Sequence, residues 1–240
     1  MTKKELKELR RMEKQERERA GNSSGSSDLT KWLILGIGGA LFLAAFAFII
    51  FSIKQSKNKP VVLSSVGYER GEKKSKVTLV EFGDLQCPAC KAYEPIVQKT
   101  LTDFKGKVKL LYKHFPLTSV HPNAMLAAKV SVAAGNQGKF WEMHDWLYEN
   151  QEQWAGLTGA DAKAKMLEEA KKLKLDMDKF NKDVNAKKTE DLISSTQTEG
   201  IDLGVASTPT FYVNNKKMDP QPSDYDAFKK VIEEEIKKAE

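Results

Sequence analysis

Residues 32–51, WLILGIGGALFLAAFAFIIF, contain no charged side chain, and this run sets the first limit on the fold. As a helix that rises about 1.5 Å per residue, the run extends over about 30 Å, the thickness of the hydrocarbon core of a bilayer. A cleavable signal peptide has a shorter apolar core followed by a small-residue cleavage site, whereas Ala45 and Ala47 lie inside this run. We therefore expect an uncleaved transmembrane signal anchor over residues 32–53, with lipid as its partner.

Basic residues are concentrated before the apolar run. Residues 1–31 contain nine Lys or Arg, and a smaller cluster, Lys54, Lys57 and Lys59, follows the run. The positive-inside rule then keeps residues 1–31 in the cytoplasm as a charged, solvated tail and linker, and sends residues 54–240 across the membrane. The sequence predicts a single-pass protein of the cytoplasmic membrane with an extracytoplasmic domain.

The net charge of the chain is +6 and its pI is about 9.0. Lysines and acidic residues are interspersed along most of the chain, so no continuous basic stripe is available to follow a phosphate backbone. We expect no binding of nucleic acid.

The chain has two cysteines, Cys87 and Cys90, three positions apart in the segment EFGDLQCPACKAYEP. Such a pair can be a redox couple, half of a metal site or a structural staple. A domain of this size can hold a core without a staple, and a bridge over so short a loop would remove little unfolded-state entropy. The pair is therefore expected to serve chemistry.

The exported part reads as an α/β domain. Residues 54–75 form a polar stem with a short first strand expected at 61–66, and the domain proper covers residues 76–240. Apolar β-branched residues predict strands at 76–82 and 107–117, with a helix from Pro88 between them, and this order implies a parallel βαβ unit. Residues 120–200 show helical periodicity without a convincing strand, with Pro122 in the first turn and a helix end at Gly135 or Gly138. A hairpin over 209–218, turning at Asn214–Asn215, and a last helix capped by Ser223 complete the prediction.

Cys87 is expected at the turn from strand to helix. Free N–H groups and the positive end of the helix dipole stabilise a thiolate there, and Pro88 fits because its missing N–H would be unpaired anyway. Cys90 lies one turn later on the same helix face. We expect Cys87 to be the exposed nucleophile and Cys90 the more buried residue that resolves a mixed disulfide.

The segments VEFGDLQCPACK, HFPL, HPNAMLAAK, QGKFWEMHDWLY and GVASTPTFYVN resemble the exported DsbA-type branch of the thioredoxin superfamily, in order and over residues 61–240. The resemblance implies a thioredoxin fold with an inserted helical subdomain at about 120–200. It also implies thiol–disulfide exchange with exported polypeptides, without a bound cofactor.

The same resemblance implies roles for further residues. Thr208 and Pro209 match the cis-proline loop that faces the cysteine pair, where the backbone of Thr208 would pair with an extended substrate. Glu81 matches a buried acid that exchanges a proton with Cys90, although its side chain could instead point to a polar edge. The dipeptide Pro88–Ala89 departs from the most oxidising members, which often have a polar residue at the place of Ala89, so a less acidic Cys87 is expected.

Function is open among three alternatives. The leading hypothesis is a membrane-tethered thiol:disulfide oxidoreductase acting as a monomeric oxidase, reoxidised by a quinone-linked membrane partner. A reductase or isomerase supplied by a membrane electron donor is the second, and a non-enzymatic metal chaperone is the third.

A metal is not expected, because zinc sites usually need four suitable ligands. His121 is expected near a helix start and His144 among packed aromatic side chains; His114 is the third histidine. The aromatic set is expected to be core: Phe140, Trp141, Trp146 and Trp154.

Overall fold

The computed structural model describes residues 3–21, 32, 46 and 61–240, which fall in two units, Met1–Pro60 and Val61–Glu240. In the first unit, helix α1 (Lys3–Gly21) is exposed over residues 4–20, as expected for a solvated arm. The expected span at 32–53 lies outside the described residues, apart from Trp32 and Phe46. Among the helices that the structure describes, none has the length and apolar character needed to cross a bilayer.

The second unit is built on a sheet with the strand order β1-β3-β2-β4-β5. Strands β2 and β3 are parallel, from Val77 opposite Val108 to Gly83 opposite His114, and the other pairs are antiparallel. The predicted βαβ unit and the hairpin at Asn214–Asn215 are confirmed. The strands are β1 (Tyr68–Arg70), β2 (Val77–Gly83), β3 (Val108–His114), β4 (Thr210–Val213) and β5 (Lys216–Lys217).

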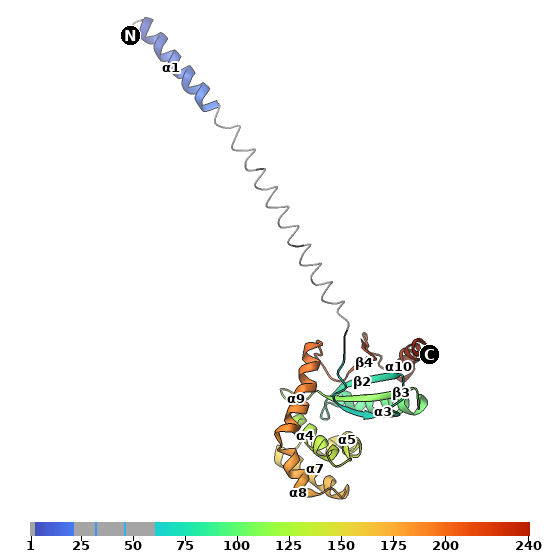
Figure 1. The fold of residues 1–240 in the computed structure, drawn as a ribbon. Helices are drawn as coiled ribbons and strands as arrows, with labels where there is room; N and C mark the ends of the chain where they lie inside the picture. Colours follow the sequence, from blue (N-terminus) through green and yellow to red (C-terminus); the bar gives the residue numbers. More distant parts are fainter. Residues whose placement is uncertain (1–2, 22–31, 33–45, 47–60) are drawn as a thin grey trace. The chain divides into compact units, whose positions relative to one another are not determined.

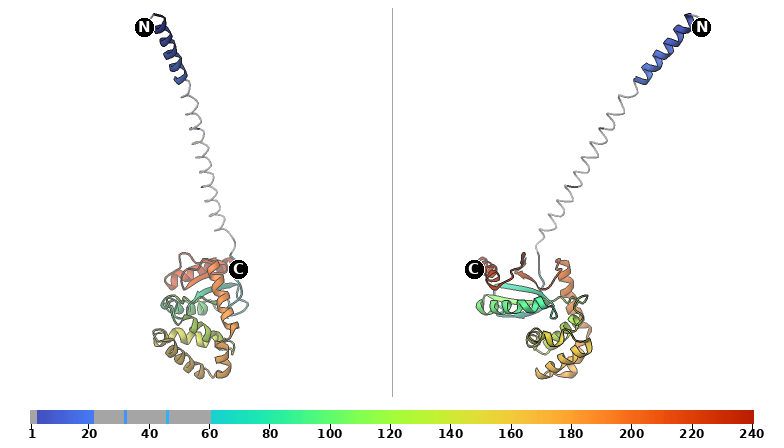
Figure 2. Two further views of the ribbon diagram at one scale, coloured as in Figure 1. Left: turned by 90° about the vertical axis from the view of Figure 1, so that its left-hand side faces the viewer. Right: turned by 180° about the vertical axis from the view of Figure 1, so that it is seen from behind.

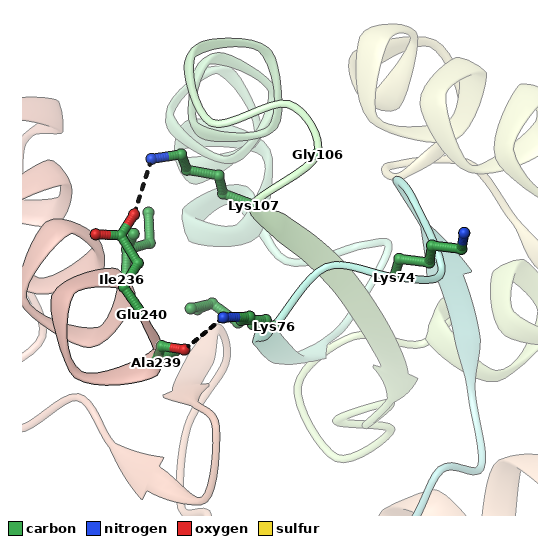
Figure 3. Close-up of a pocket in the computed structure, with 8 residues that line it drawn as sticks. Lys74, Lys76, Gly106, Lys107, Ile236, Ala239 and Glu240 are labelled. Carbon is green, nitrogen blue, oxygen red and sulfur yellow. Dashed lines mark hydrogen bonds and ion pairs between the residues drawn. The ribbon is translucent and has the colours of Figure 1, made fainter.

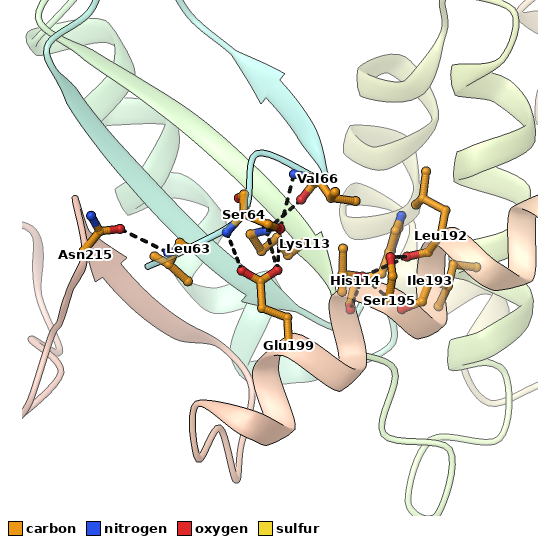
Figure 4. A network of polar contacts seen from close by, with 11 residues as sticks. Leu63, Ser64, Val66, Lys113, His114, Leu192, Ile193, Ser195, Glu199 and Asn215 are labelled. Carbon is orange, nitrogen blue, oxygen red and sulfur yellow. Dashed lines mark hydrogen bonds and ion pairs between the residues drawn. The ribbon is translucent and has the colours of Figure 1, made fainter. Parts of the chain in front are cut away.

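Residues 61–66 do not form the expected strand; the first strand is Tyr68–Arg70. Side chains bind the backbone of this segment instead, as Figure 4 shows: Ser64 N donates to Glu199 Oε1 at 2.6 Å, and Lys113 Nζ donates to Ser64 O at 2.9 Å and Val66 O at 2.7 Å. Lys113 also pairs with Glu199 at 2.7 Å, and its side chain is fully buried. The folded unit therefore includes residues 61–75, which the sequence analysis assigned to the stem.

Each face of the sheet carries its own apolar core. The helix α3 (Pro88–Asp103) and the last helix α10 (Tyr225–Ala239) share a core with β2, β3 and β4, in which Val97 and Phe228 contact Leu79 and its neighbours. The opposite face carries Val80 and Phe82, which pack with Phe115 and Tyr212.

A helical subdomain is inserted between β3 and β4, as predicted, and it occupies one side of the sheet (Figures 1 and 2). Its core includes residues of α4, α5 and α7 together with both cysteines. The inserted helices are α4 (Ala124–Gly135), α5 (Phe140–Glu149), α6 (Gln151–Trp154), α7 (Gly159–Lys172), α8 (Met177–Val184) and α9 (Lys187–Asp202).

Two helix starts differ from the sequence analysis. α4 begins at Ala124, two residues after Pro122, and ends at Gly135 as expected. The prediction that Ser223 caps the last helix is wrong: Asp224 is the cap, because its Oδ1 accepts a hydrogen bond from Ala227 N at 2.9 Å.

The C-terminal end of α10 is fixed beside the start of the two parallel strands (Figure 3). Lys76 Nζ donates to Ala239 O at 2.9 Å, and Lys107 pairs with Glu240 at 3.1 Å. Both lysines directly precede a strand, so these contacts lie at the opposite end of β2 from the cysteine pair.

Candidate active site

Cys87 is the N-cap residue of α3, which begins at Pro88 after a short loop from the end of β2. Its backbone is extended (φ −71°, ψ 122°), and Lys91 N donates to Cys87 O at 3.2 Å in the first helical turn. The sulfur therefore stands where the free N–H groups of a helix start favour negative charge.

The two thiols differ in environment. Both are free and both are buried. The expectation of an exposed Cys87 is wrong, because only 6% of its surface is exposed, whereas Cys90 has no exposed surface. Between them Pro88 and Ala89 are exposed. An incoming protein can thus approach Cys87 from the side of this dipeptide.

The pKa of the Cys87 thiol is lowered from 9.0 to about 5. The largest cause is a hydrogen bond from the Cys90 thiol, which stabilises the thiolate, and burial opposes it; the Thr208 side chain and the backbone of Cys90 and Ala89 lower the pKa further. The result lies between about 7 for thioredoxin and about 3.5 for the strong oxidant DsbA. For Cys90, burial raises the pKa well above its usual value, so this thiol stays protonated.

Glu81 lies in β2 and is 1% exposed, so the alternative of a polar edge is excluded. Burial raises the pKa of its carboxyl group well above the ordinary value, with smaller contributions from Glu94 and Cys87. Its Oε2 is buried without a protein hydrogen-bond partner. At this place the protonated carboxyl group can give a proton to the Cys90 thiolate, and its carboxylate form can take one from the Cys90 thiol.

The Thr208–Pro209 peptide bond is cis and lies at the entrance to β4. Cys87 Sγ is 3.4 Å from Thr208 O, so the structure brings the proline loop against the nucleophile. The sequence-predicted residues Cys87, Cys90, Thr208 and Pro209 therefore form one site.

Sequence reasoning missed Asp84, which is 1% exposed and organises the loop before Cys87. Asp84 Oδ1 accepts from Gln86 N at 2.8 Å, and Oδ2 accepts from Leu117 N at 2.9 Å and lies 2.7 Å from His121 Nδ1. The sequence signal that could have identified Asp84 is an acidic residue directly after a buried strand.

Two glutamines that the sequence analysis also missed join this loop to the inserted helices. Gln151 Nε2 donates to Leu85 O at 3.0 Å and to Cys87 O at 3.1 Å. Gln86 Nε2 donates to Ala155 O at 2.7 Å, and its Oε1 accepts from Asn123 N at 2.6 Å. The insertion thus fixes the backbone that carries the nucleophile.

The three histidines have roles that do not involve the cysteine sulfurs. His121 pairs with Asp84, and burial lowers the pKa of His114 to about 3, so its ring is neutral. His144 packs against aromatic rings, as predicted, including Tyr148 at a centroid distance of 4.9 Å. The aromatic set belongs to the core, with Phe140 and Trp154 buried and Trp141 and Trp146 packed against them. Within the described part of the chain, the group of side chains close enough for a cation is Glu94, His144 and Asp145, which excludes both cysteines.

The family model described as Thioredoxin matches residues 65–234, so this chain belongs to the thioredoxin family. A solved structure, the oxidised BdbD of Bacillus subtilis, superposes with a TM-score of 0.61 at 25% identity, covering 74% of this chain and 96% of that one. A probable disulfide bond formation protein D of Bacillus cereus is 29% identical over 213 residues, which are 86% of this chain and 95% of that protein. The chain is a thioredoxin-like oxidoreductase of the DsbA type, with Cys87 and Cys90 as its CxxC pair.

Longer proteins also contain a similar segment. The Na+/H+ antiporter NhaA 1 of Salinispora arenicola is 36% identical over 194 residues, which are 80% of this chain. The chain spans 28% of the length of that antiporter.

Proposed function

We propose that this protein exchanges disulfides with exported polypeptides, chiefly as an oxidase, while tethered to the cytoplasmic membrane. The observation that carries the proposal is the asymmetry of the cysteine pair: Cys87 at the helix start has a pKa lowered to about 5, and Cys90 behind it is fully buried. A thiolate that is stabilised in the reduced protein makes the disulfide a better oxidant.

In the oxidising direction, a client thiolate attacks Sγ of Cys87 in the disulfide form. The Cys87–Cys90 bond breaks, a mixed disulfide forms at Cys87, and Cys90 leaves as a thiolate. Because Cys90 is buried, this thiolate takes up a proton, which Glu81 is placed to give. A second client thiolate then attacks the client sulfur of the mixed disulfide and releases Cys87 as a stable thiolate.

The reverse direction uses the same atoms. Cys87 attacks a client disulfide, Glu81 takes the proton of Cys90, and Cys90 attacks Cys87 to release the client. The backbone of Thr208, in contact with Cys87, is the proposed pairing edge for an extended client chain. Because main-chain pairing reads no side chain, it supports a broad range of clients.

The proposed setting follows from the N-terminal residues. Residues 32–53 would anchor the protein, with residues 1–31 in the cytoplasm and the folded unit outside. The name of the Bacillus cereus relative supports disulfide formation, and a similar segment within antiporters, which act in membranes, supports work at a bilayer. A quinone-linked membrane protein is the proposed oxidant, and the enzyme is proposed to act as a monomer. Protease added to intact spheroplasts should digest residues 54–240 and spare residues 1–31; full protection would contradict this topology.

The second candidate is a reductase or isomerase. Ala89 favours it, because an alanine side chain beside the nucleophile offers no charge or donor to the thiolate. The two directions differ in the stability of the dithiol relative to the disulfide, which is a measurable quantity.

The equilibrium of the cysteine pair against glutathione buffers separates these candidates. A potential more positive than about −180 mV, the value of protein disulfide isomerase, supports an oxidase, and one near −270 mV, the value of thioredoxin, contradicts it. In cells, Cys90→Ser should accumulate mixed disulfides with client proteins, and the matched Cys87→Ser variant should accumulate none. An absence of trapped clients in Cys90→Ser would contradict exchange itself.

A further inference from the structure

A second set of buried polar groups starts beside Glu81 and is not used by the mechanism above. Glu94 lies on α3 four residues after Cys90, so both side chains project from the same face of the helix. Glu94 Oε1 accepts from Gln98 Nε2 at 2.5 Å, and its Oε2 is buried without a protein partner. Glu94 faces Glu81 closely enough to raise the pKa of that carboxyl group.

His144 on α5 continues this set away from the cysteines. It is fully buried, and its Nε2 also has no protein partner. One carboxylate oxygen each of Glu94 and Asp145 and one ring nitrogen of His144 all lie within 4.8 Å of one another. His144 Nδ1 lies 2.9 Å from Asp145 Oδ1.

The set ends at groups that solvent reaches. Asp145 Oδ2 accepts from Arg70 Nη2 at 2.6 Å, and the two side chains are 35% and 21% exposed. The guanidinium of Arg70 stacks on the ring of Trp141 at 4.2 Å. The described residues thus provide a series of ionisable groups between the buried thiol and the surface, in which Glu94, His144 and Asp145 lie within 4.8 Å of one another.

Unpartnered buried polar atoms are costly, because they lose their hydrogen bonds to water without a replacement. Glu81, Glu94 and His144 each contribute one such atom. A proton shared along the series would give these atoms their missing partner at each stage. A bound cation fits less well, because Asp145 already pairs with Arg70 and Glu94 Oε1 already binds Gln98.

We propose that Glu94 and His144 relay protons between Glu81 and solvent at Asp145, and so set the rate at which Cys90 gains or loses its proton. The proposal rests on the thiol exchange proposed above. When Cys90 leaves as a thiolate, Glu81 gives it a proton, and a solvent proton that enters at His144 beside Asp145 passes through the carboxylate of Glu94 to restore Glu81. One proton thus enters for each thiol formed, and no electron moves along the series.

Other titratable groups face the series from the neighbouring elements, and any pH profile includes their effect. They are Cys87 on α3, Tyr112 and His114 on β3, Arg70 on β1, and Tyr148 on α5.

The test isolates the step in which Cys90 must lose its proton. Reduced full-length protein is mixed with excess glutathione disulfide, and quenched samples give separate rates for glutathionylation of Cys87 and for the attack of Cys90. Glu94→Gln and His144→Gln should slow the attack of Cys90 about tenfold or more and flatten its pH profile between pH 5 and 9. Both should leave the glutathionylation rate of Cys87 unchanged, and Glu94→Asp should restore part of the loss.

The matched control is Glu142→Gln, which changes an exposed carboxylate on the same helix as His144. In this variant Cys90 should attack the mixed disulfide at the wild-type rate. Attack rates of Glu94→Gln or His144→Gln within twofold of that control would overturn the relay, whereas a wild-type protein that never forms the mixed disulfide would refute the exchange function instead. If the buried His144→Gln variant does not fold, the rates of Glu94→Gln and of the wild type still test the relay. In wild type, attack rates in mixtures of H2O and D2O should curve as expected for more than one proton in motion, and a straight line would overturn the relay. One zinc ion per chain that is lost in Glu94→Gln would overturn it too.

Discussion

At the scale of single residues, the chemistry depends on how the environment separates two identical thiols. Cys87 stands at a helix start with its thiolate stabilised, and Cys90 lies fully buried one turn later. The burial that keeps Cys90 protonated makes it a hydrogen-bond donor to Cys87, so the high pKa of one thiol helps to produce the low pKa of the other.

Glu81 is the residue that we propose connects this pair to proton transfer. Because a glutamine cannot take a proton from Cys90, Glu81→Gln should slow the attack of Cys90 on a mixed disulfide by about 10- to 100-fold. It should leave the glutathionylation rate of Cys87 within twofold, since the lowered pKa of Cys87 comes chiefly from the hydrogen bond that Cys90 donates. Quenched-flow kinetics with glutathione disulfide measure both steps, and an unchanged rate of attack would refute the role of Glu81.

The side chain of Ala89 has no charge and no hydrogen-bond donor that could lower the pKa of Cys87 further. Ala89→His adds a donor and a positive charge beside the thiolate, so the pKa of Cys87 should fall below about 5 and the redox potential should rise by about 30 mV, a tenfold change in equilibrium. Ala92→His, at an exposed position farther along the same helix, is the control and should move neither quantity. A potential that stays the same in Ala89→His would show that position 89 does not tune this couple.

At the scale of elements, Lys113 holds residues 61–66 to the sheet and to α9 (Figure 4). Removing one partner of a buried ion pair leaves the other charge buried without a counter-charge. Lys113→Met should therefore lower the free energy of unfolding by about 3 kcal/mol. The double change Lys113→Met with Glu199→Gln should recover part of this loss. Denaturant unfolding measures both, and a single variant as stable as wild type would contradict the proposed role of the pair.

Elements with strong local patterns were predictable from sequence. The βαβ unit, the hairpin at Asn214 and the helical insertion follow from apolar periodicity and turn residues, which act over a few positions. The expected strand at 61–66 failed because its backbone groups bind Lys113 and Glu199, residues far away in the chain. Periodicity carries no information about such distant side chains.

The same limit applies to the site. Cys87 and Cys90 were identifiable because of their unusual spacing. Glu81 was identifiable because a carboxylate in an apolar strand is unusual. Gln151 was not, because its contact with Cys87 O spans 64 positions and an isolated glutamine has no distinctive pattern.

At the scale of the folded unit Val61–Glu240, the cysteine pair belongs to the core of the insertion rather than to that of the sheet. Leu85 and both cysteines pack with residues of α4, α5 and α7, and Gln151 binds the loop backbone. The sheet therefore positions the helix start, and the insertion supplies the burial that makes the two thiols different.

The stability of the reduced form should depend on pH through Cys87. Folding lowers the pKa of this thiol from 9.0 to about 5, so its stabilising contribution grows as the pH rises from about 5 and is lost as the pH falls through that value. Between pH 5 and 7 the reduced form should gain about 1–2 kcal/mol relative to the oxidised form, after allowance for solvent screening. Denaturant unfolding of both forms over this range measures the difference, and one that is independent of pH would contradict a stabilised thiolate.

The most direct test of the central claim is titration of the Cys87 thiol itself in the reduced protein. The rate of alkylation by iodoacetamide is followed against pH, with Cys90→Ala as the variant that removes the donor at position 90. The structure predicts a midpoint of about 5 in the wild type and a higher midpoint in Cys90→Ala, because the hydrogen bond from Cys90 is the largest cause of the lowered pKa. A wild-type midpoint near 9.0, the ordinary value for a thiol, would contradict the claim that this fold makes Cys87 a thiolate at neutral pH.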